Sequence, residues 1–451
     1  MTTVKPPQPR TRRPSLQEML QASPYQDYVY SYPHKTAYRS IDPPVPLETL
    51  WSKQNRQALF LYIHIPFCEM RCGFCNLFTT VKRDDDFVSQ YIETVRKQAR
   101  RVKAALGEAS FARFAIGGGT PTQLPLHGLE AILNIAEETM GARLQEIPIS
   151  VEMSPETIDP SKMKLLRSRG VDRASIGVQS FIDSEVLAIN RRQSASQVEA
   201  AIALMQEAGF PTINIDLMYG LPGQTVETWL RSLRAALRFQ PQEIYLYPLY
   251  VRPLTYMGRS DKEWDDTRLA CYREGRAFLL SEGYTQVSMR MFRAKQAPEL
   301  SGPVYCCQAD GMVGLGCGAR SYTNTLHYST NYAVETKQIN QILQAYIASS
   351  EEAFDYANYG FQLDSEECRR RYMLLSLLSD EGLNCTAYRT HFGTDVFADL
   401  PELSELLPLG LATLEQETLY LTDVGIERSD TIGPWLFSDK VRHLMEEYEL
   451  Q

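Results

Sequence analysis

Three cysteines, Cys68, Cys72 and Cys75, follow an apolar segment over residues 58–65 with the spacing C-x3-C-x2-C. Three thiolates on one short loop can bind three irons of a four-iron, four-sulfur (4Fe-4S) cluster. The fourth iron then lacks a protein ligand, and an open coordination position is typical of a catalytic metal site. A structural zinc site would need a second cysteine pair, and disulfides would need an oxidising compartment. The spacing therefore favours a cluster that binds and reduces a small molecule.

The cysteine motif, with an aromatic residue before its last cysteine, resembles that of the radical S-adenosylmethionine (SAM) superfamily. The preceding Tyr62-Ile-His-Ile-Pro-Phe67 narrows the resemblance to oxygen-independent coproporphyrinogen III oxidases and their heme-chaperone relatives. Further matches, in family order within about residues 55–445, are Gly117-Gly118-Gly119-Thr120-Pro121-Thr122, Glu152 in Ile149-Ser-Val-Glu, Gly177-Val-Gln179-Ser-Phe181, Arg191, and Asp216 in Asn214-Ile-Asp-Leu-Met-Tyr-Gly-Leu-Pro-Gly223. A glycine-rich loop alone is weak support, whereas the ordered set is specific.

The resemblance implies a 4Fe-4S cluster on the three cysteines and SAM on its open iron. The residues that it assigns to SAM are Tyr62, Phe74, Gly118, Gly119, Thr120, Glu152, Gln179, Arg191 and Asp216. Their chemistry suits these roles, because a carboxylate such as Glu152 accepts two hydrogen bonds from ribose hydroxyls and Arg191 suits a carboxylate. Tyr62 is also the candidate catalytic residue, since the matching tyrosine of the oxidases contacts cofactor or substrate.

Structural alternatives stay open for these residues. Phe74 and Tyr62 also suit core packing, and Arg191 or Asp216 alone would more often form a surface ion pair. His64 is expected to be a core residue rather than a ligand.

Strand-like and helix-like segments alternate over residues 59–290, which predicts a parallel sheet covered by helices. Strands are expected near 59–65, 111–117, 147–153, 172–178, 212–218, 243–249 and 285–290, and helices near 84–106, 127–140, 160–169, 195–208, 225–238 and 263–282. About six such repeats predict an α/β fold, an open partial (β/α)6 barrel. The motifs fall at the carboxyl ends of the strands, where barrels carry their active sites.

Three parts of the chain are expected. Residues 1–54 form an N-terminal extension, disordered to about Ser23; residues 55–330 form the barrel; and residues 331–451 form a mostly helical domain that resembles a winged-helix unit. Residues 361–451 contain 7 Lys+Arg and 18 Asp+Glu, a net charge of −11. This charge argues against DNA binding by the winged-helix-like part, because phosphate contacts supply most such affinity.

Composition limits the partners and the location. The formal charge of −9 over 451 residues argues against a nucleic-acid partner, and the sequence has no apolar run of about 20 residues for a membrane span. The start is polar and basic, so no signal peptide is expected, and the six other cysteines are scattered. We therefore expect a cytoplasmic monomer. The resemblance implies a small-molecule substrate and an external one-electron donor such as flavodoxin or ferredoxin.

The resemblance implies reductive cleavage of SAM to methionine and a 5′-deoxyadenosyl radical, which then modifies a small molecule; tetrapyrrole-like compounds are candidates. Two departures keep the substrate open. Leu77 stands where the porphyrinogen oxidases have a further cysteine, and Tyr305-Cys-Cys-Gln308 stands where heme chaperones have a histidine-containing segment. One alternative is a C-methyltransferase or cyclopropane-forming enzyme that uses two SAM molecules. The other is a heme chaperone without catalysis.

Overall fold

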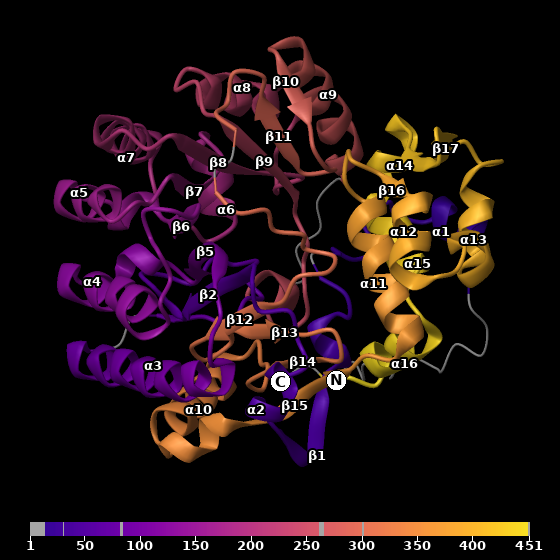
Figure 1. Cartoon of the computed structure of the whole chain (residues 1–451). Helices are drawn as coiled ribbons and strands as arrows, with labels where there is room; N and C mark the ends of the chain where they lie inside the picture. Colours follow the sequence, from indigo (N-terminus) through magenta and orange to yellow (C-terminus); the bar gives the residue numbers. More distant parts are fainter. Residues whose placement is uncertain (1–13, 30, 82–83, 261–265, 300–301, 450–451) are drawn as a thin grey trace, which may run out of the picture. The chain divides into compact units, whose positions relative to one another are not determined.

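The computed structural model describes residues 14–29, 31–81, 84–260, 266–299 and 302–449 (Figure 1). Contacts divide the chain into two compact units. We call Lys35–Cys368 with Tyr448–Gln451 the sheet unit, and Met1–His34 with Arg369–Glu447 the helical unit. The predicted boundaries at residues 54 and 330 do not coincide with these units, and the three-part domain organisation stays a prediction. The tail predicted as disordered falls partly on residues 1–13, outside the described residues, and partly on helix α1 (Leu16–Gln21).

The sheet unit is built on a 13-stranded sheet, counted over the described residues. Its central parallel strands are β2 (Leu59–Ile65), β5 (Phe111–Gly118), β6 (Ile149–Met153), β7 (Arg173–Gln179), β8 (Thr212–Tyr219) and β9 (Glu243–Pro248). Each lies within about two residues of a predicted strand. Further strands, most of them antiparallel to their neighbours, extend the sheet on both sides, and its two edge strands do not pair with each other, as an open partial barrel requires.

These flanking strands complete the sheet. On the β2 side are β12 (Met312–Leu315), which is parallel to β2, then β13 (Arg320–Tyr322), β14 (Leu326–Ser329), β15 (Tyr356–Gln362) and β1 (Arg39–Pro46). On the β9 side are β11 (Met291–Ala294) and β10 (Tyr284–Gln286). The strand predicted over 285–290 is therefore wrong in part. Its residues form β10 and a turn, because the backbone N–H of Val287 donates to Met291 and reverses the chain.

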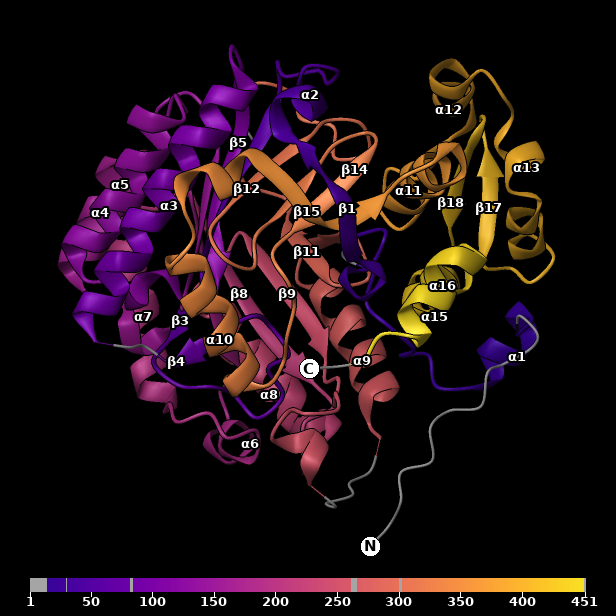
Figure 2. The same ribbon diagram turned by 90° about the horizontal axis from the view of Figure 1, so that it is seen from below.

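Helices connect the parallel strands. They are α3 (Asp85–Leu106), α4 (Leu126–Asn134), α5 (Pro160–Ser168), α6 (Asp183–Ala188), α7 (Ala195–Ala208) and α8 (Val226–Leu237), with α9 (Arg268–Ser281) after β9. Side chains of Asp84, Ser194 and Thr225 cap α3, α7 and α8, which explains their sharp starts. In Figures 1 and 2, α3, α4, α5 and α7 lie on one side of the parallel strands.

The two faces of β7 show how the sheet is used. Ala174, Ile176 and Val178 are fully buried, whereas the alternate residues Arg173 and Gln179 keep partial access to solvent. Successive side chains of a strand point to opposite faces. The apolar face therefore packs under the helices, and the other face is left for polar side chains.

The helical unit contains most of α11 (Ser365–Leu377), whose first turn belongs to the sheet unit. It also contains α12 (Cys385–Phe392), α13 (Val396–Asp399), α14 (Asp423–Glu427), α15 (Ser429–Trp435) and α16 (Asp439–Glu446). A small antiparallel sheet joins β16 (Leu383–Asn384), β18 (Thr418–Leu421) and β17 (Ala412–Glu415). Helices with a β-hairpin are the winged-helix-like pattern predicted from the sequence. Across the described ranges, none of the helices is both long and apolar enough to span a membrane.

Candidate active site

The cysteine loop begins where β2 ends and is held at both of its sides. Residues Phe67–Cys68 form β3, which pairs with β4 (Thr80–Val81) and closes the loop. In the middle of the loop, the N–H of Gly73 donates to the carbonyl of Ile189 (2.8 Å), and the N–H of Met257 donates to the carbonyl of Gly73 (2.9 Å). The loop is therefore fixed by segments that follow β7 and β9.

The three cysteines are free thiols with partial solvent access. Burial, followed by the neighbouring Cys75, raises the pKa of Cys68 to about 12, and burial raises that of Cys72 despite the nearby Arg191 guanidinium. The three thiols lie on one short loop, and each thiolate of such a loop can bind a different iron of a 4Fe-4S cluster.

The glycine-rich loop after β5 packs directly on the cysteine loop. The N–H of Gly119 donates to the carbonyl of Ile65, and the N–H of Thr120 donates to that of Phe67, both at 2.7 Å. A Cβ on Gly119 would lie 2.6 Å from the Phe67 carbonyl oxygen and 3.0 Å from the Sγ of Cys68. Glycine is therefore required for the two loops to meet, and backbone is left close to the cluster position.

Glu152 ends β6 on the polar face of the sheet. Its Oε2 accepts a hydrogen bond from the N–H of Gly118 (2.9 Å), and its carboxylate lies over Gly117, where a Cβ would be 2.8 Å from Oε2. Burial raises its pKa, yet the side chain remains exposed to solvent. A residue surrounded by protein and still accessible lines a hollow, so we infer an accessible interior on this face of the sheet.

Arg191, which is almost completely buried, reaches this interior from the segment after α6. Its Nη1 donates to the Sγ of Cys72 (3.2 Å), and its Nη2 donates to the carbonyl of Gly177 (2.6 Å). Its Nε donates to the Oε1 of Gln193 (2.6 Å), whose own amide donates to the Val178 carbonyl. The guanidinium is thus fixed beside the cysteine loop, as anion recognition requires.

Gln179 has a backbone conformation that is unusual for a residue with a side chain. Its φ is 69°, and it lies at a bulge where β7 and β8 lose register. Its Nε2 would be 3.0 Å from a Cβ on Gly177, so the side chain folds back along its own strand. Such strain is frequent at functional sites, and the role of Gln179 in SAM binding stays a prediction.

Tyr62 and His64 are alternate residues of β2 and are linked by a hydrogen bond. His64 Nε2 lies 2.9 Å from the Phe78 carbonyl oxygen, so this nitrogen carries the proton and Nδ1 accepts from the Tyr62 hydroxyl (3.2 Å). Burial lowers the pKa of His64 to about 4, which keeps the ring neutral at pH 7. His64 therefore orients Tyr62 and leaves the tyrosine oxygen free to accept.

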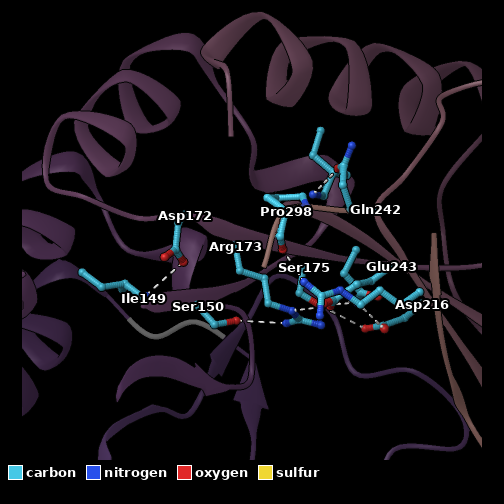
Figure 3. Close-up of polar contacts among 12 residues, drawn as sticks. Ile149, Ser150, Asp172, Arg173, Ser175, Asp216, Gln242, Glu243 and Pro298 are labelled. Atoms are coloured by element: carbon cyan, nitrogen blue, oxygen red, sulfur yellow. Dashed lines mark hydrogen bonds and ion pairs between the residues drawn. The ribbon is translucent and has the colours of Figure 1, made fainter. Parts of the chain in front are cut away.

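A partly buried ion pair lies on the same face of β7 and β9 (Figure 3). The Nε of Arg173 donates to the Oε2 of Glu243 (2.7 Å), and its Nη1 donates to the Ser150 hydroxyl (3.0 Å). The Arg173 guanidinium also lies over the ring of Tyr245. These contacts compensate the two charges, so the pair forms a rigid polar part of the interior.

Asp216 lies next to this ion pair on β8 (Figure 3). Its carboxylate accepts from the Asn214 side-chain amide (2.8 Å) and from the Ser175 hydroxyl (3.5 Å). Burial raises its pKa to about 6, although the Asn214 hydrogen bond acts in the opposite direction. Asp216 and Glu152 are therefore two neighbouring acidic groups with raised pKa values, a pattern frequent at functional sites.

Phe74 packs on the apolar side of the loop. It contacts a buried cluster made of Ile189, Met218, Leu221, Leu249 and Met257, with Tyr247 beside it. This environment agrees with the core-aromatic alternative for Phe74. It also provides an apolar wall next to the cysteine loop, and contact of Phe74 with adenine stays a prediction.

The structure thus brings the predicted residues to the loops and strand ends around one interior, while their individual roles stay predictions. Sequence reasoning missed three partners of Arg191 and the cysteine loop: Glu69, Ser154 and Gln193. Each lies close in sequence to a motif residue, although the sequence does not indicate which residue it contacts. Ser154 and Gln193 are two residues beyond Glu152 and Arg191, and Glu69 lies within the cysteine motif.

Of the two sequence departures, Leu77 lies next to Cys75, whereas the segment Tyr305–Gln308 lies apart from the cysteine loop. Tyr305 packs edge-on against Phe60 (5.6 Å between centroids), near the start of β2. The thiols of Cys306 and Cys307 donate to the Gln308 side chain. The cysteine pair therefore lies toward the opposite end of β2 from the cysteine loop.

The chain is similar in sequence and fold to several known proteins. Residues 62–236 match the model of the radical SAM superfamily. The chain is 26% identical to heme chaperone HemW of Bacillus subtilis over 81% of this chain and 95% of the relative. It is 27% identical to oxygen-independent coproporphyrinogen III oxidase of Escherichia coli over 89% and 91%. The solved structure of coproporphyrinogen III oxidase (HemN) from Escherichia coli matches 91% of this chain and 96% of its own, with a TM-score of 0.76 and 23% identity.

Residues 62–236 form a radical SAM domain, and the cofactors are a 4Fe-4S cluster and SAM. The similarity to both HemW and the coproporphyrinogen oxidase supports a HemN/HemW-like radical SAM family. The fold similarity to HemN agrees with the predicted α/β partial barrel. The relatives carry two different functional names, so the family leaves the reaction of this chain open.

Proposed function

We propose that this protein is an enzyme that reductively cleaves SAM and uses the resulting radical to modify a small molecule. The observation that carries the proposal is Arg191, which contacts the Sγ of Cys72 and lies within reach of Ser154 beside the accessible interior. When bound, the 4Fe-4S cluster supplies the electron that divides SAM into methionine and a 5′-deoxyadenosyl radical. An external donor such as flavodoxin or ferredoxin would supply that electron.

The residues of the chain would bind and orient the cofactor. Cys68, Cys72 and Cys75 would hold the cluster, and Arg191 would bind the methionine carboxylate of SAM. Glu152 would accept hydrogen bonds from the ribose, since among the described residues its carboxylate accepts from the Gly118 amide alone. Tyr62, oriented by His64, would contact cofactor or substrate at the same interior.

For the substrate we propose a tetrapyrrole-like compound, in line with the name of the Escherichia coli oxidase. Glu152 and Asp216 give the interior two carboxylates, while the Arg173 guanidinium is already paired with Glu243. Leu77, which is half-exposed, stands where the oxidases have a further cysteine. The reaction is therefore proposed to be oxidase-like rather than identical to decarboxylation of coproporphyrinogen.

The test is anaerobic reconstitution with iron and sulfide, followed by SAM and dithionite and mass spectrometry of the products. We expect close to four irons per chain and 5′-deoxyadenosine. S-adenosylhomocysteine beside it would replace the oxidase-like proposal by methyl transfer. Heme binding without any SAM cleavage would replace it by a chaperone.

A further inference from the structure

Glu69, inside the cysteine motif, has an incompletely satisfied carboxylate. The Ser154 hydroxyl donates to its Oε1 at 2.6 Å. Its Oε2 is buried, and no described residue donates a hydrogen bond to it. Leaving a buried acceptor unpaired costs free energy, so such an atom in a folded protein needs an explanation.

A complementary positive group lies on the other side of the same hydroxyl. Arg191 donates from Nη2 to the Ser154 Oγ at 3.5 Å, and from Nη1 to the Sγ of Cys72 at 3.2 Å. A guanidinium has five N–H donors. Within the described part of the chain, one Nη1 N–H has no acceptor, so the arginine retains a donor for a ligand.

We propose that Glu69 and Arg191, bridged by Ser154, recognise the α-amino acid end of SAM. Glu69 accepts hydrogen bonds from the amine, and Arg191 donates to the carboxylate. The amine and carboxylate of an amino acid are borne by one carbon, so the ligand presents both groups side by side, as the protein presents their complements. Glu69 adjoins Cys68, which places its carboxylate at the cysteine loop where this end of SAM would bind. The inference rests on the proposed function and adds a residue to it.

In a purely structural role, Glu69 would only link the cysteine loop to the end of β6. The Ser154 hydrogen bond to Oε1 already makes this link, and a neutral glutamine would make it equally well. The buried Oε2 has no part in such a link. A ligand amine would satisfy it and would require the negative charge.

The experiment compares two ligands on cluster-loaded protein by equilibrium binding without a reductant. SAM carries the amino acid, whereas 5′-methylthioadenosine has the same nucleoside and sulfur without it. Glu69→Gln should weaken SAM binding by about tenfold and change methylthioadenosine binding by less than about twofold. Glu156→Gln is the matched control, because this exposed carboxylate lies two residues after Ser154, and it should change neither ligand.

Equal changes for both ligands in Glu69→Gln, or no change for SAM, would overturn the proposal. If Glu69→Gln loses iron, Ser154→Ala decides: a selective loss of SAM affinity supports the proposal, and unchanged selectivity overturns it. Wild-type protein that binds SAM but forms no 5′-deoxyadenosine would contradict the proposed function instead. The two failures are therefore distinguishable.

Discussion

The two faces of the central strands differ in what they contribute. On β7, the face under the helices carries Ala174, Ile176 and Val178, all without solvent exposure. The opposite face carries Arg173 and Gln179, which are partly accessible. Burial of apolar surface stabilises the fold, whereas polar groups in an accessible interior can bind a ligand. On this strand, one set of alternating residues stabilises the fold, and the other set is available for binding.

The polar face that lines the interior carries several features that reduce the stability of the fold. Burial raises the pKa of both Glu152 and Asp216, because desolvation costs free energy for their ionised forms. Gln179 has a positive φ, and the Asn214 Oδ1 is buried without a hydrogen-bond partner among the described residues. Such unfavourable features persist where binding requires them. We therefore expect changes on the two faces to separate stability from binding.

We expect the largest loss of activity from a substitution in the cysteine loop. Cys72→Ala should abolish SAM cleavage, because two thiolates cannot retain the cluster in its active form. Iron content and 5′-deoxyadenosine formation after anaerobic reconstitution measure the effect. Cys385→Ala, a buried cysteine of the helical unit, is the matched control and should retain iron. Normal 5′-deoxyadenosine formation by Cys72→Ala would contradict the assignment of the cluster.

The next effect concerns the apolar face. Ile176→Ala should lower the free energy of unfolding by about 3 kcal/mol, since it removes a fully buried side chain and leaves a cavity. Urea denaturation of the unloaded protein measures this change. Iron content and SAM affinity of the folded fraction should stay at wild-type values. A selective loss of SAM affinity would show that the two faces are not independent.

The sheet was predictable because alternating apolar segments are local signals that strands and helices express directly. The limits of β2 and β5 follow the predicted segments closely. The turn after β10 was not predictable, because the apolar pattern of 285–290 continues through a chain reversal. The short strands around residues 312–329 were also missed, since a strand of three or four residues is too short to show a period.

The site was predictable where a motif has fixed spacing along the chain, as in the cysteine loop and Gly118–Thr120. Pairwise contacts between distant segments were not. Nothing in the sequence indicates that Glu69 meets Ser154, or that Gln193 holds the Arg191 guanidinium. The environment of Asp216 was also hidden, because its raised pKa depends on burial created by several strands.

On the interior face, Arg191→Ala should weaken SAM binding by roughly 1.5–3 kcal/mol, the range for a hydrogen bond to a charged group. Glu152→Gln should weaken it less, because the amide keeps one acceptor oxygen. Equilibrium binding to the cluster-loaded proteins measures both changes, and denaturation midpoints of the unloaded proteins verify that the fold is retained. Unchanged SAM affinity in both variants would mean that the pocket lies elsewhere.

The smallest predicted effect concerns Asp216. Substitution of this residue should increase the free energy of unfolding, whereas Ile176→Ala should lower it. The pKa of Asp216 in the folded protein is about 6, whereas the ordinary value is 3.8, so the unfolded chain loses this proton first as pH rises. The contribution of Asp216 to stability therefore falls between pH 4 and 6. Asp216→Asn removes this loss and keeps an oxygen that can accept from Asn214. We expect the unloaded variant to be more stable than wild type by about 1–2 kcal/mol at pH 7.5, after allowance for partial solvent access, with little difference near pH 4. Denaturation at the two pH values measures the effect; an equal gain in the free energy of unfolding at both would assign it to packing rather than to ionisation.

Asp216→Asn should also bind SAM more weakly. Such a result would show directly that the polar residues of the interior face reduce stability and support binding.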